Sequence, residues 1–444
     1  MYYLLARPNS SIHFGPQSTV KLTGGDEDIK TTFFYGWVIV AVSAALGFLG
    51  TGFYSYSRGI FLDDLSIAIA NGDRTEISFA FSSAFVMGTL MAPFIGRLLD
   101  RSSPKKVLMY GVAIVTCSYL LLSQVETILQ FYLVTTIGRG LGMACMGGLA
   151  WHRSIINWFD HWRGRAVSVA VLGASLAGVA MPAVVERLIT NYGWQTTYQI
   201  FALVLLLGLS PVVWLLFIDR PEQIKEVRDG RQYATTNSQP EELFERDNRT
   251  WSLKELVKNP AFWSIGLIFG TMLSIWSAVM LHLVGHLKDI GLETVWYIIS
   301  AQAAFAALGK PVVGIASDFL GARITIWSAL SLQVLALLLF GAASEENVLI
   351  LAACIYGLGY SGMSPLRTFA ISTSLGSKSF GTASGAMRYV ELPFQMLAAP
   401  AAALIYDHTG SYQLAFSLLA GMALIACLGP FFISVGGARE RKDK

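Results

Sequence analysis

The sequence predicts an all-α membrane protein of twelve transmembrane helices, arranged as two pseudo-symmetric six-helix bundles. Three observations carry this prediction. The composition is 54% hydrophobic and only 14% charged, whereas soluble domains carry about 25% charged residues. Apolar runs of roughly 20 residues, the length that crosses a bilayer as a helix, recur along the chain. Several short motifs occur twice, at a nearly constant distance in sequence.

Twelve apolar segments are expected to cross the membrane, six before and six after one long polar stretch. They lie near 34–58, 76–96, 105–124, 128–151, 165–188, 196–218, 260–284, 293–316, 324–342, 347–371, 380–404 and 412–434. The predicted organisation is a cytoplasmic N-terminal tail (1–33), a first bundle (34–219), a cytoplasmic linker (220–259), a second bundle (260–435) and a cytoplasmic C-terminal tail (436–444).

The repeated motifs relate the two halves at an offset of 217 or 218 residues. The pairs are Gly96 to Asp100 with Gly314 to Asp318, Gly140-Leu141-Gly142 with Gly357-Leu358-Gly359, Gly164 and Ala166 with Gly381 and Ala383, Pro182 with Pro400, and Tyr192-Gly193 with Thr409-Gly410. Five matches at one offset indicate two bundles of the same topology, related by an axis along the membrane normal. Secondary transporters use this arrangement.

Basic residues in the short loops predict the orientation. They gather in the loops that hold Arg97, Lys105, Arg165 and Arg323, on the same side as the linker. Both termini are therefore expected in the cytoplasm, in a multi-pass protein of the plasma (inner) membrane, surrounded by lipid. The net charge of +3 is dispersed among loops, so a nucleic-acid partner is not expected.

The sequence gives no sign of an enzyme. The four cysteines fall inside apolar runs and are expected to be packing residues. No phosphate-binding loop, nucleophile elbow or zinc-ligand spacing occurs. No cofactor, no metal site and no ATP drive are therefore expected.

The turn Gly96-Arg97-Leu98-Leu99-Asp100-Arg101, its repeat at Gly314 to Asp318 and the 6+6 layout resemble the major facilitator superfamily. The first turn departs from the family pattern, which usually has glycine where Ser103 or Pro104 stands. Other features are similar to the monocarboxylate and oxalate/formate branch. They are Phe34-Tyr35-Gly36-Trp37, Asn157-Trp158-Phe159, Arg163-Gly164-Arg165-Ala166, and Lys310-Pro311 with Gly314.

The resemblance implies a cytoplasmic gate built from Asp100, Arg101, Asp318 and Arg323. In the family, such charges latch the two halves together when the cavity faces outward. The alternative is that they are solvated loop charges that only fix the topology.

Three basic residues within predicted spans are candidates for binding substrate. Arg139 lies near the middle of span four, where an arginine costs about 2.5–3.5 kcal/mol even on insertion scales; the alternative is a structural ion pair or bonds to helix carbonyls. Lys310 is the position at which the branch contacts substrate carboxylate; the alternative is snorkelling to the interface. Arg388 lies close to the midplane in span eleven. Tyr54 is a further candidate for the cavity wall or for ordinary packing, whereas Arg58 and Arg367 are expected to snorkel.

Glu391 follows Arg388 by one helical turn and is the candidate proton carrier. A pair at this spacing can neutralise itself as a structural element. It can also act as a switch, in which the substrate anion competes for the arginine and the glutamate takes the proton.

The predicted function is secondary active transport of a small organic anion, with a monocarboxylate favoured, together with H⁺, by alternating access in a monomer. Anion exchange and efflux of a drug-like or amphipathic compound are the alternatives within transporters. A membrane receptor that does not transport is the alternative from another class.

Overall fold

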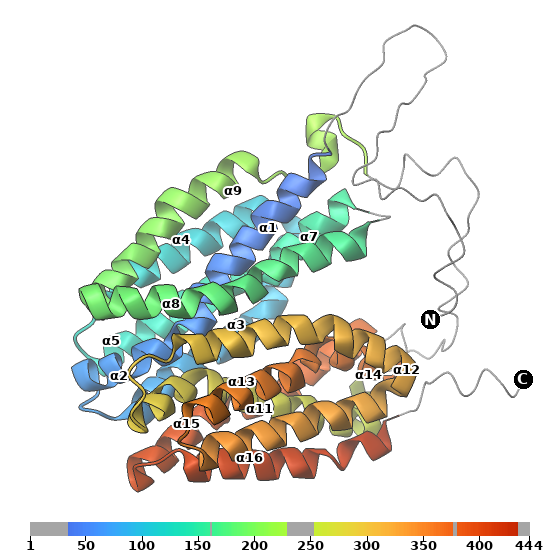
Figure 1. Ribbon diagram of the computed structural model, residues 1–444. Helices are drawn as coiled ribbons and strands as arrows, with labels where there is room; N and C mark the ends of the chain where they lie inside the picture. The colour runs from blue at the N-terminus through green and yellow to red at the C-terminus, as the bar shows by residue number, and fades with distance from the viewer. Residues whose placement is uncertain (1–33, 160–161, 229–252, 376–379, 434–444) are drawn as a thin grey trace, which may run out of the picture.

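The computed structural model describes residues 34–159, 162–228, 253–375 and 380–433, and these residues form helices, turns and loops. Two helical halves lie side by side, one built from residues 36–216 and the other from residues 260–432 (Figure 1). Both predicted tails and much of the predicted linker lie outside the described residues.

The first half contains twelve helical segments, three of which are short π-helical stretches (η1, η2 and η3). They are α1 (Gly36–Thr51), η1 (Gly52–Tyr56), α2 (Arg58–Ile69), α3 (Arg74–Arg101), α4 (Pro104–Leu122), α5 (Ile128–Leu133), η2 (Val134–Gly140), α6 (Leu141–Met146), α7 (Gly148–Trp158), α8 (Arg163–Leu203), η3 (Val204–Leu209) and α9 (Ser210–Leu216).

The described part of the linker contains η4 (Pro221–Ile224) and α10 (Leu253–Lys258). The helices of the second half are α11 (Pro260–Asp289), α12 (Trp296–Ala342), α13 (Glu346–Ser361), α14 (Met363–Leu375), α15 (Phe380–Thr409), α16 (Gln413–Ala426) and η6 (Gly429–Phe432).

The described residues give the twelve predicted spans. Ten helices are long and apolar enough to cross a membrane. One of them, Arg165–Leu216, is 52 residues long and bends at Gly193, where the backbone leaves the helical region, so it provides two spans. Helix α15 adds another 30-residue span that is interrupted by Pro393 and Pro400. The predicted fold class is therefore confirmed.

The sequence repeat is visible in the backbone contacts. Gly193 and Gly410 both have positive φ values, 78° and 69°, at equivalent turns of the two halves. A Cβ at Gly140 would lie 2.9 Å from the carbonyl oxygen of Ala84, and one at Gly357 would lie 2.3 Å from that of Gln302. Ala84 and Gln302 are themselves 218 residues apart, so the same close helix approach occurs in both halves.

Two motifs that are far apart in sequence pack against each other in the first half. The ring of Phe34 contacts the rings of Trp158 and Phe159, with centroids 5.8 and 5.3 Å apart, and Trp37 contacts Phe159 at 5.3 Å. A Cβ at Gly36 would meet the ring of Phe159 at 3.0 Å. The aromatic residues that open α1 therefore fasten it to the end of α7.

The two ends of the bundle differ, and each is given a name here. The linker side is the end at which residues 34, 228, 253 and 433 lie, and the distal side is the opposite end, where α2 is followed by α3 and α11 by α12 (Figure 1). The loops that hold Arg97, Lys105, Arg165 and Arg323 are all on the linker side.

On the linker side, each half ties its third span to its sixth, with different chemistry. In the first half, Asp219 accepts hydrogen bonds from the Ser103 hydroxyl and from the backbone N–H of Lys105, the latter at 2.7 Å. In the second half, Arg323 donates to the carbonyl oxygens of Pro430 and Ile433, at 2.8 and 3.0 Å.

The two turns that precede these ties also differ. Gly321 has a φ of 79°, whereas Ser103 is extended with a φ of −64° and is followed by Pro104 at the start of α4. Because Ser103 has ordinary backbone angles, the first turn works without the glycine that is usual there.

Candidate functional site

The two halves are joined on the distal side by a network centred on Arg74, at the start of α3. Its Nη1 donates to Asp289 at 2.9 Å and to the Tyr412 hydroxyl at 3.2 Å, and its Nη2 lies 2.8 Å from Asp63 of its own half. The guanidinium also lies 4.1 Å from the centroid of the Tyr406 ring. One arginine of the first half is thus held by α11, α15 and the residue before α16 in the second.

Further contacts extend this distal closure. The backbone N–H and hydroxyl of Thr75 both donate to Asp407. The backbone N–H of Val295 donates to Glu186 at 3.4 Å. A Cβ at Gly59 would lie 2.8 Å from the carbonyl oxygen of Met280, so α2 and α11 approach closely. In the described residues, the polar contacts between the halves lie on the distal side or near mid-height.

Arg139 is 1% exposed and is held by main-chain carbonyls. Its Nη2 donates to the carbonyl oxygens of Phe53 and Tyr54, at 3.4 and 3.3 Å. Both acceptors belong to η1, and Arg139 itself belongs to η2. A π-helical turn disrupts the regular ladder of backbone hydrogen bonds, which leaves carbonyls for a side chain to satisfy. Arg139 therefore fastens span four to the irregular turn in span one.

Arg58, at the start of α2, is the residue of the site that the sequence analysis missed. It was expected to snorkel, but it is 2% exposed, and its Nε and Nη2 are buried without a hydrogen-bond partner. Its guanidinium lies 4.9 Å from the ring centroid of Phe85 and 5.0 Å from that of Trp276. Phe85 belongs to the first half and Trp276 to the second, so this cation lies between the halves.

The reason for the miss is the length of span one. The predicted span ended at 58, which placed Arg58 at the membrane interface. In the structure the helical path continues through η1 into α2 and ends at Ile69, which moves Arg58 into the interior. A run of Asp63 and Asp64 after the apolar segment suggested an end too early, because Asp63 pairs with Arg74 within the protein.

The other predicted substrate residues lie in the following places. Lys310 Nζ donates to the hydroxyl of Ser175 at 2.9 Å, which joins α12 of the second half to α8 of the first. The side chain of Arg388 is exposed and makes no ion pair or hydrogen bond among the described residues. The ring of Tyr54 lies against Phe85 with centroids 5.3 Å apart. The role of each in binding substrate stays a prediction.

Glu391 pairs with Arg367 of α14 and not with its neighbour Arg388. Its Oε1 accepts from Arg367 Nε at 2.6 Å, and its Oε2 is buried without a partner. Arg367 also donates to the hydroxyl and the carbonyl of Ser384, each at 3.2 Å. Arg367, which was expected to snorkel, therefore crosses between α14 and α15, and Glu391 keeps one oxygen free.

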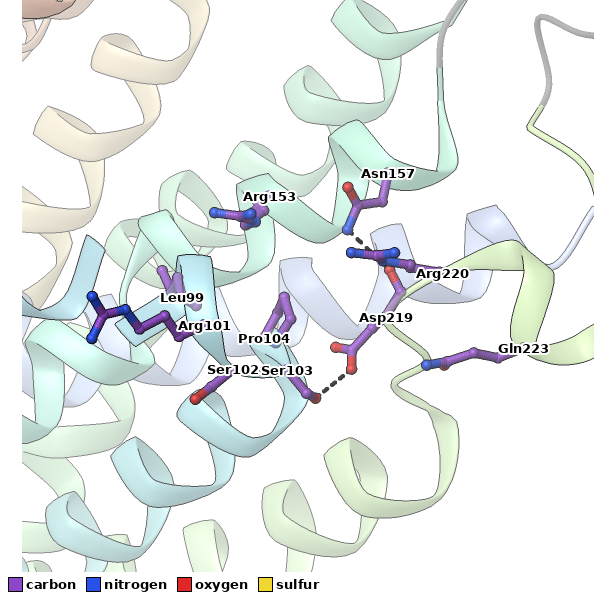
Figure 2. Close-up of a pocket in the computed structure, with 10 residues that line it drawn as sticks. All are labelled: Leu99, Arg101, Ser102, Ser103, Pro104, Arg153, Asn157, Asp219, Arg220 and Gln223. Carbon is purple, nitrogen blue, oxygen red and sulfur yellow. Dashed lines mark hydrogen bonds between the residues drawn. The ribbon is translucent and has the colours of Figure 1, made fainter. Parts of the chain in front are cut away.

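The predicted cytoplasmic gate is only partly described. Nothing is described of the side chains of Asp100 and Asp318. Arg101 lies at the edge of a polar cavity of about 250 Å³ that Arg153, Asn157 and Arg220 also line. Figure 2 shows Arg101 pointing away from the tie between Ser103 and Asp219. The gate role of these residues stays a prediction.

The family model for the Major Facilitator Superfamily matches residues 31–389 and 287–444. The chain belongs to the Major Facilitator Superfamily. Over 374 residues it is 24% identical to the uncharacterized MFS-type transporter YcxA of Bacillus subtilis, covering 81% of this chain and 87% of that protein. Over 428 residues it is 24% identical to monocarboxylate transporter 13 of Rattus norvegicus, covering 92% of each chain.

The solved structures agree with this assignment at the level of the fold. The nucleoside transporter NupG has a TM-score of 0.67 and 13–14% identity is typical of these matches: NupG is 14% identical, and the match covers 89% of this chain and 99% of NupG. This superfamily member is thus a multi-pass membrane transporter, and the resemblance to the monocarboxylate branch has support from its relatives.

Proposed function

We propose that this superfamily member carries a small organic anion, a monocarboxylate in the first instance, and that Arg58 binds the carboxylate. The observation that carries the proposal is a guanidinium between the halves that is 2% exposed and has two nitrogens without an acceptor. Leaving such a group unpaired costs more than pairing it or replacing it with an apolar residue. An arginine fork matches the two oxygens of a carboxylate, so an anionic substrate would satisfy it.

The partners of the predicted cations support this choice. Arg139 already has two carbonyl acceptors, so its role is to hold η1, which carries Tyr54 and leads to Arg58. Lys310 and Arg388 lie nearer the linker side, where their positive charge attracts an anion toward Arg58. Tyr54 borders the same space, since its ring packs on Phe85 beside the guanidinium.

Protons are proposed as the coupling ion, with Glu391 as the carrier. The carboxylate is 1% exposed, and one of its oxygens has no partner. Arg388, one helical turn away, is exposed and unpaired in the described residues. An anion that approaches Arg388 alters the charge near Glu391, which is the requirement for linking proton and substrate.

The linker side is proposed to face the cytoplasm, in the plasma (inner) membrane, with both termini on that side. The basic loops that hold Arg97, Lys105, Arg165 and Arg323 are on the linker side, as the excess of basic residues in cytoplasmic loops requires. The distal closure through Arg74 then corresponds to a carrier that is shut toward the outside. Alternating access would require this closure to open.

The test is uptake of a labelled monocarboxylate into proteoliposomes under an inward proton gradient. Arg58→Gln is expected to abolish uptake, and Arg58→Lys is expected to retain part of it. Arg187→Gln is the matched control, because Arg187 is exposed on α8 and removes the same charge elsewhere. Wild-type activity in Arg58→Gln would overturn the site. Uptake that needs internal anion but no proton gradient would replace symport with exchange, and net export would indicate efflux.

A further inference from the structure

Aromatic rings from both halves form a continuous path beside Arg58. Tyr54 contacts Phe85 with ring centroids 5.3 Å apart, and Phe85 contacts Trp276 at 5.9 Å. Trp276 in turn stacks on Tyr360 at 6.3 Å with an interplanar angle of 11°. The contact between Phe85 and Trp276 crosses the interface between the halves. The cation at Arg58 lies over both of these rings.

These rings are partly exposed within an otherwise buried region. From Ile268 to Leu287, every residue of α11 is buried except Trp276. Tyr54, Phe85 and Tyr360 are partly exposed as well. Side chains that only fill a core lose their solvent-accessible surface completely. The four rings therefore border accessible space between the halves.

A second aromatic cluster shows what pure packing looks like in the same chain. Phe61 stacks on Tyr198 with centroids 4.3 Å apart, and Phe53 stacks on Phe201 at 3.9 Å. All four of these residues are 5% exposed or less, and all four belong to the first half. The rings beside Arg58 differ in both respects, because they are partly exposed and come from both halves.

We infer that the carboxylate substrate carries an aromatic ring, so that the ligand class is an aryl or arylalkyl carboxylate. The inference rests on the proposed function, which places the carboxylate on Arg58. A carboxylate held by that guanidinium has its substituent next to the faces of Phe85 and Trp276, since the cation is 4.9 and 5.0 Å from their centroids. Aromatic rings gain from offset or edge-to-face contact with another ring beyond the area that they bury. A short hydrophilic acid makes no such contact.

The test compares acids of equal charge and similar size on the purified full-length chain. Thermal shift measures affinity for benzoate against cyclohexanecarboxylate, and for phenylacetate against cyclohexylacetate, with propionate as the short acid. The aryl member of each pair is expected to bind about 3–10-fold more tightly, from one ring contact. Equal affinity within both pairs would overturn the inference. Absence of stabilisation by every acid would instead overturn the proposed function.

Variants of Trp276 assign the preference to this ring. Trp276→Leu is expected to remove the aryl preference and to leave the affinity for cyclohexanecarboxylate within about twofold, whereas Trp276→Phe keeps a ring and retains the preference. Trp214→Leu is the matched control, because Trp214 is 63% exposed on α9. A Trp276→Leu protein that keeps the full aryl preference would contradict the assignment. If that variant does not fold, Tyr360→Leu makes the same test on the neighbouring ring.

Discussion

Removing the charge of Arg74 is expected to open the distal side. Arg74→Gln breaks the contacts that Arg74 makes with the second half, which are the two hydrogen bonds to Asp289, at 2.9 and 3.3 Å, and the one to Tyr412, at 3.2 Å. It leaves the internal contacts of each half in place. The contacts that are lost exist only while the distal side is closed, so the substitution acts on the conformational equilibrium.

The magnitude follows from the burial of the pair. The side chains of Arg74 and Asp289 are 11% and 28% exposed, between the fully exposed and fully buried cases. Exposed pairs contribute about 0.2–1 kcal/mol, and breaking a buried pair costs about 3–5 kcal/mol. A loss of about 2 kcal/mol lowers the ratio of distal-closed to distal-open molecules by roughly 30-fold.

The assay is double electron–electron resonance between spin labels on the distal side. Labels at Glu126→Cys and Glu293→Cys, both exposed positions, report the separation of the halves after the four native cysteines are replaced. Arg74→Gln is expected to shift the distance distribution to longer values. Arg187→Gln, which removes an exposed charge near the same side, is expected to leave it unchanged.

A double-mutant cycle makes the test specific. Asp289→Asn is expected to shift the distribution in the same direction, and the double variant is expected to shift it less than the sum of the two, because both remove one interaction. An unchanged distribution in Arg74→Gln, or full additivity in the cycle, would refute the assignment of Arg74 as the distal latch.

Three further outcomes are expected. Arg139→Met lowers the melting temperature because two main-chain carbonyls lose their donor, at about 1–3 kcal/mol for each buried group left unsatisfied, whereas Arg58→Met keeps or raises it while abolishing uptake; circular dichroism and uptake assays measure the two effects. Gly357→Ala places a Cβ 2.3 Å from a carbonyl oxygen and costs at least about 1–3 kcal/mol, whereas Gly385→Ala, with no atom within 4 Å, is neutral or slightly stabilising in the same melts. Glu391→Gln removes the dependence of uptake on the proton gradient but leaves exchange of substrate across the membrane intact, measured by counterflow.

The fold was predictable because it depends on patterns that extend over many residues. Apolar runs of bilayer length and a repeat at one offset give the number of helices and the relation of the halves without any knowledge of contacts. The repeat even locates close approaches, since Gly140 and Gly357 pack on carbonyls of residues that are also 218 apart.

The site was less predictable because it depends on which polar atoms already have partners. From sequence, Arg139 and Arg58 are both arginines near apolar runs. The irregular η1 turn separates their roles, since it offers carbonyls to Arg139 and leaves Arg58 with rings alone. Likewise, Glu391 pairs with Arg367, 24 residues away in sequence, and helical spacing alone favoured Arg388.

Helix α2 joins the proposed site to the distal latch. Its first residue is Arg58 and its sixth is Asp63, which contacts Arg74 at 2.8 Å. Between them, Gly59 lies against the carbonyl of Met280, a contact between the halves that must break when the distal side opens. A helix of this length moves as a unit, since each residue is fixed by its backbone hydrogen bonds. An anion that changes the position of Arg58 therefore acts on the same element that supports the latch, which provides a physical route from binding to the opening of the distal side.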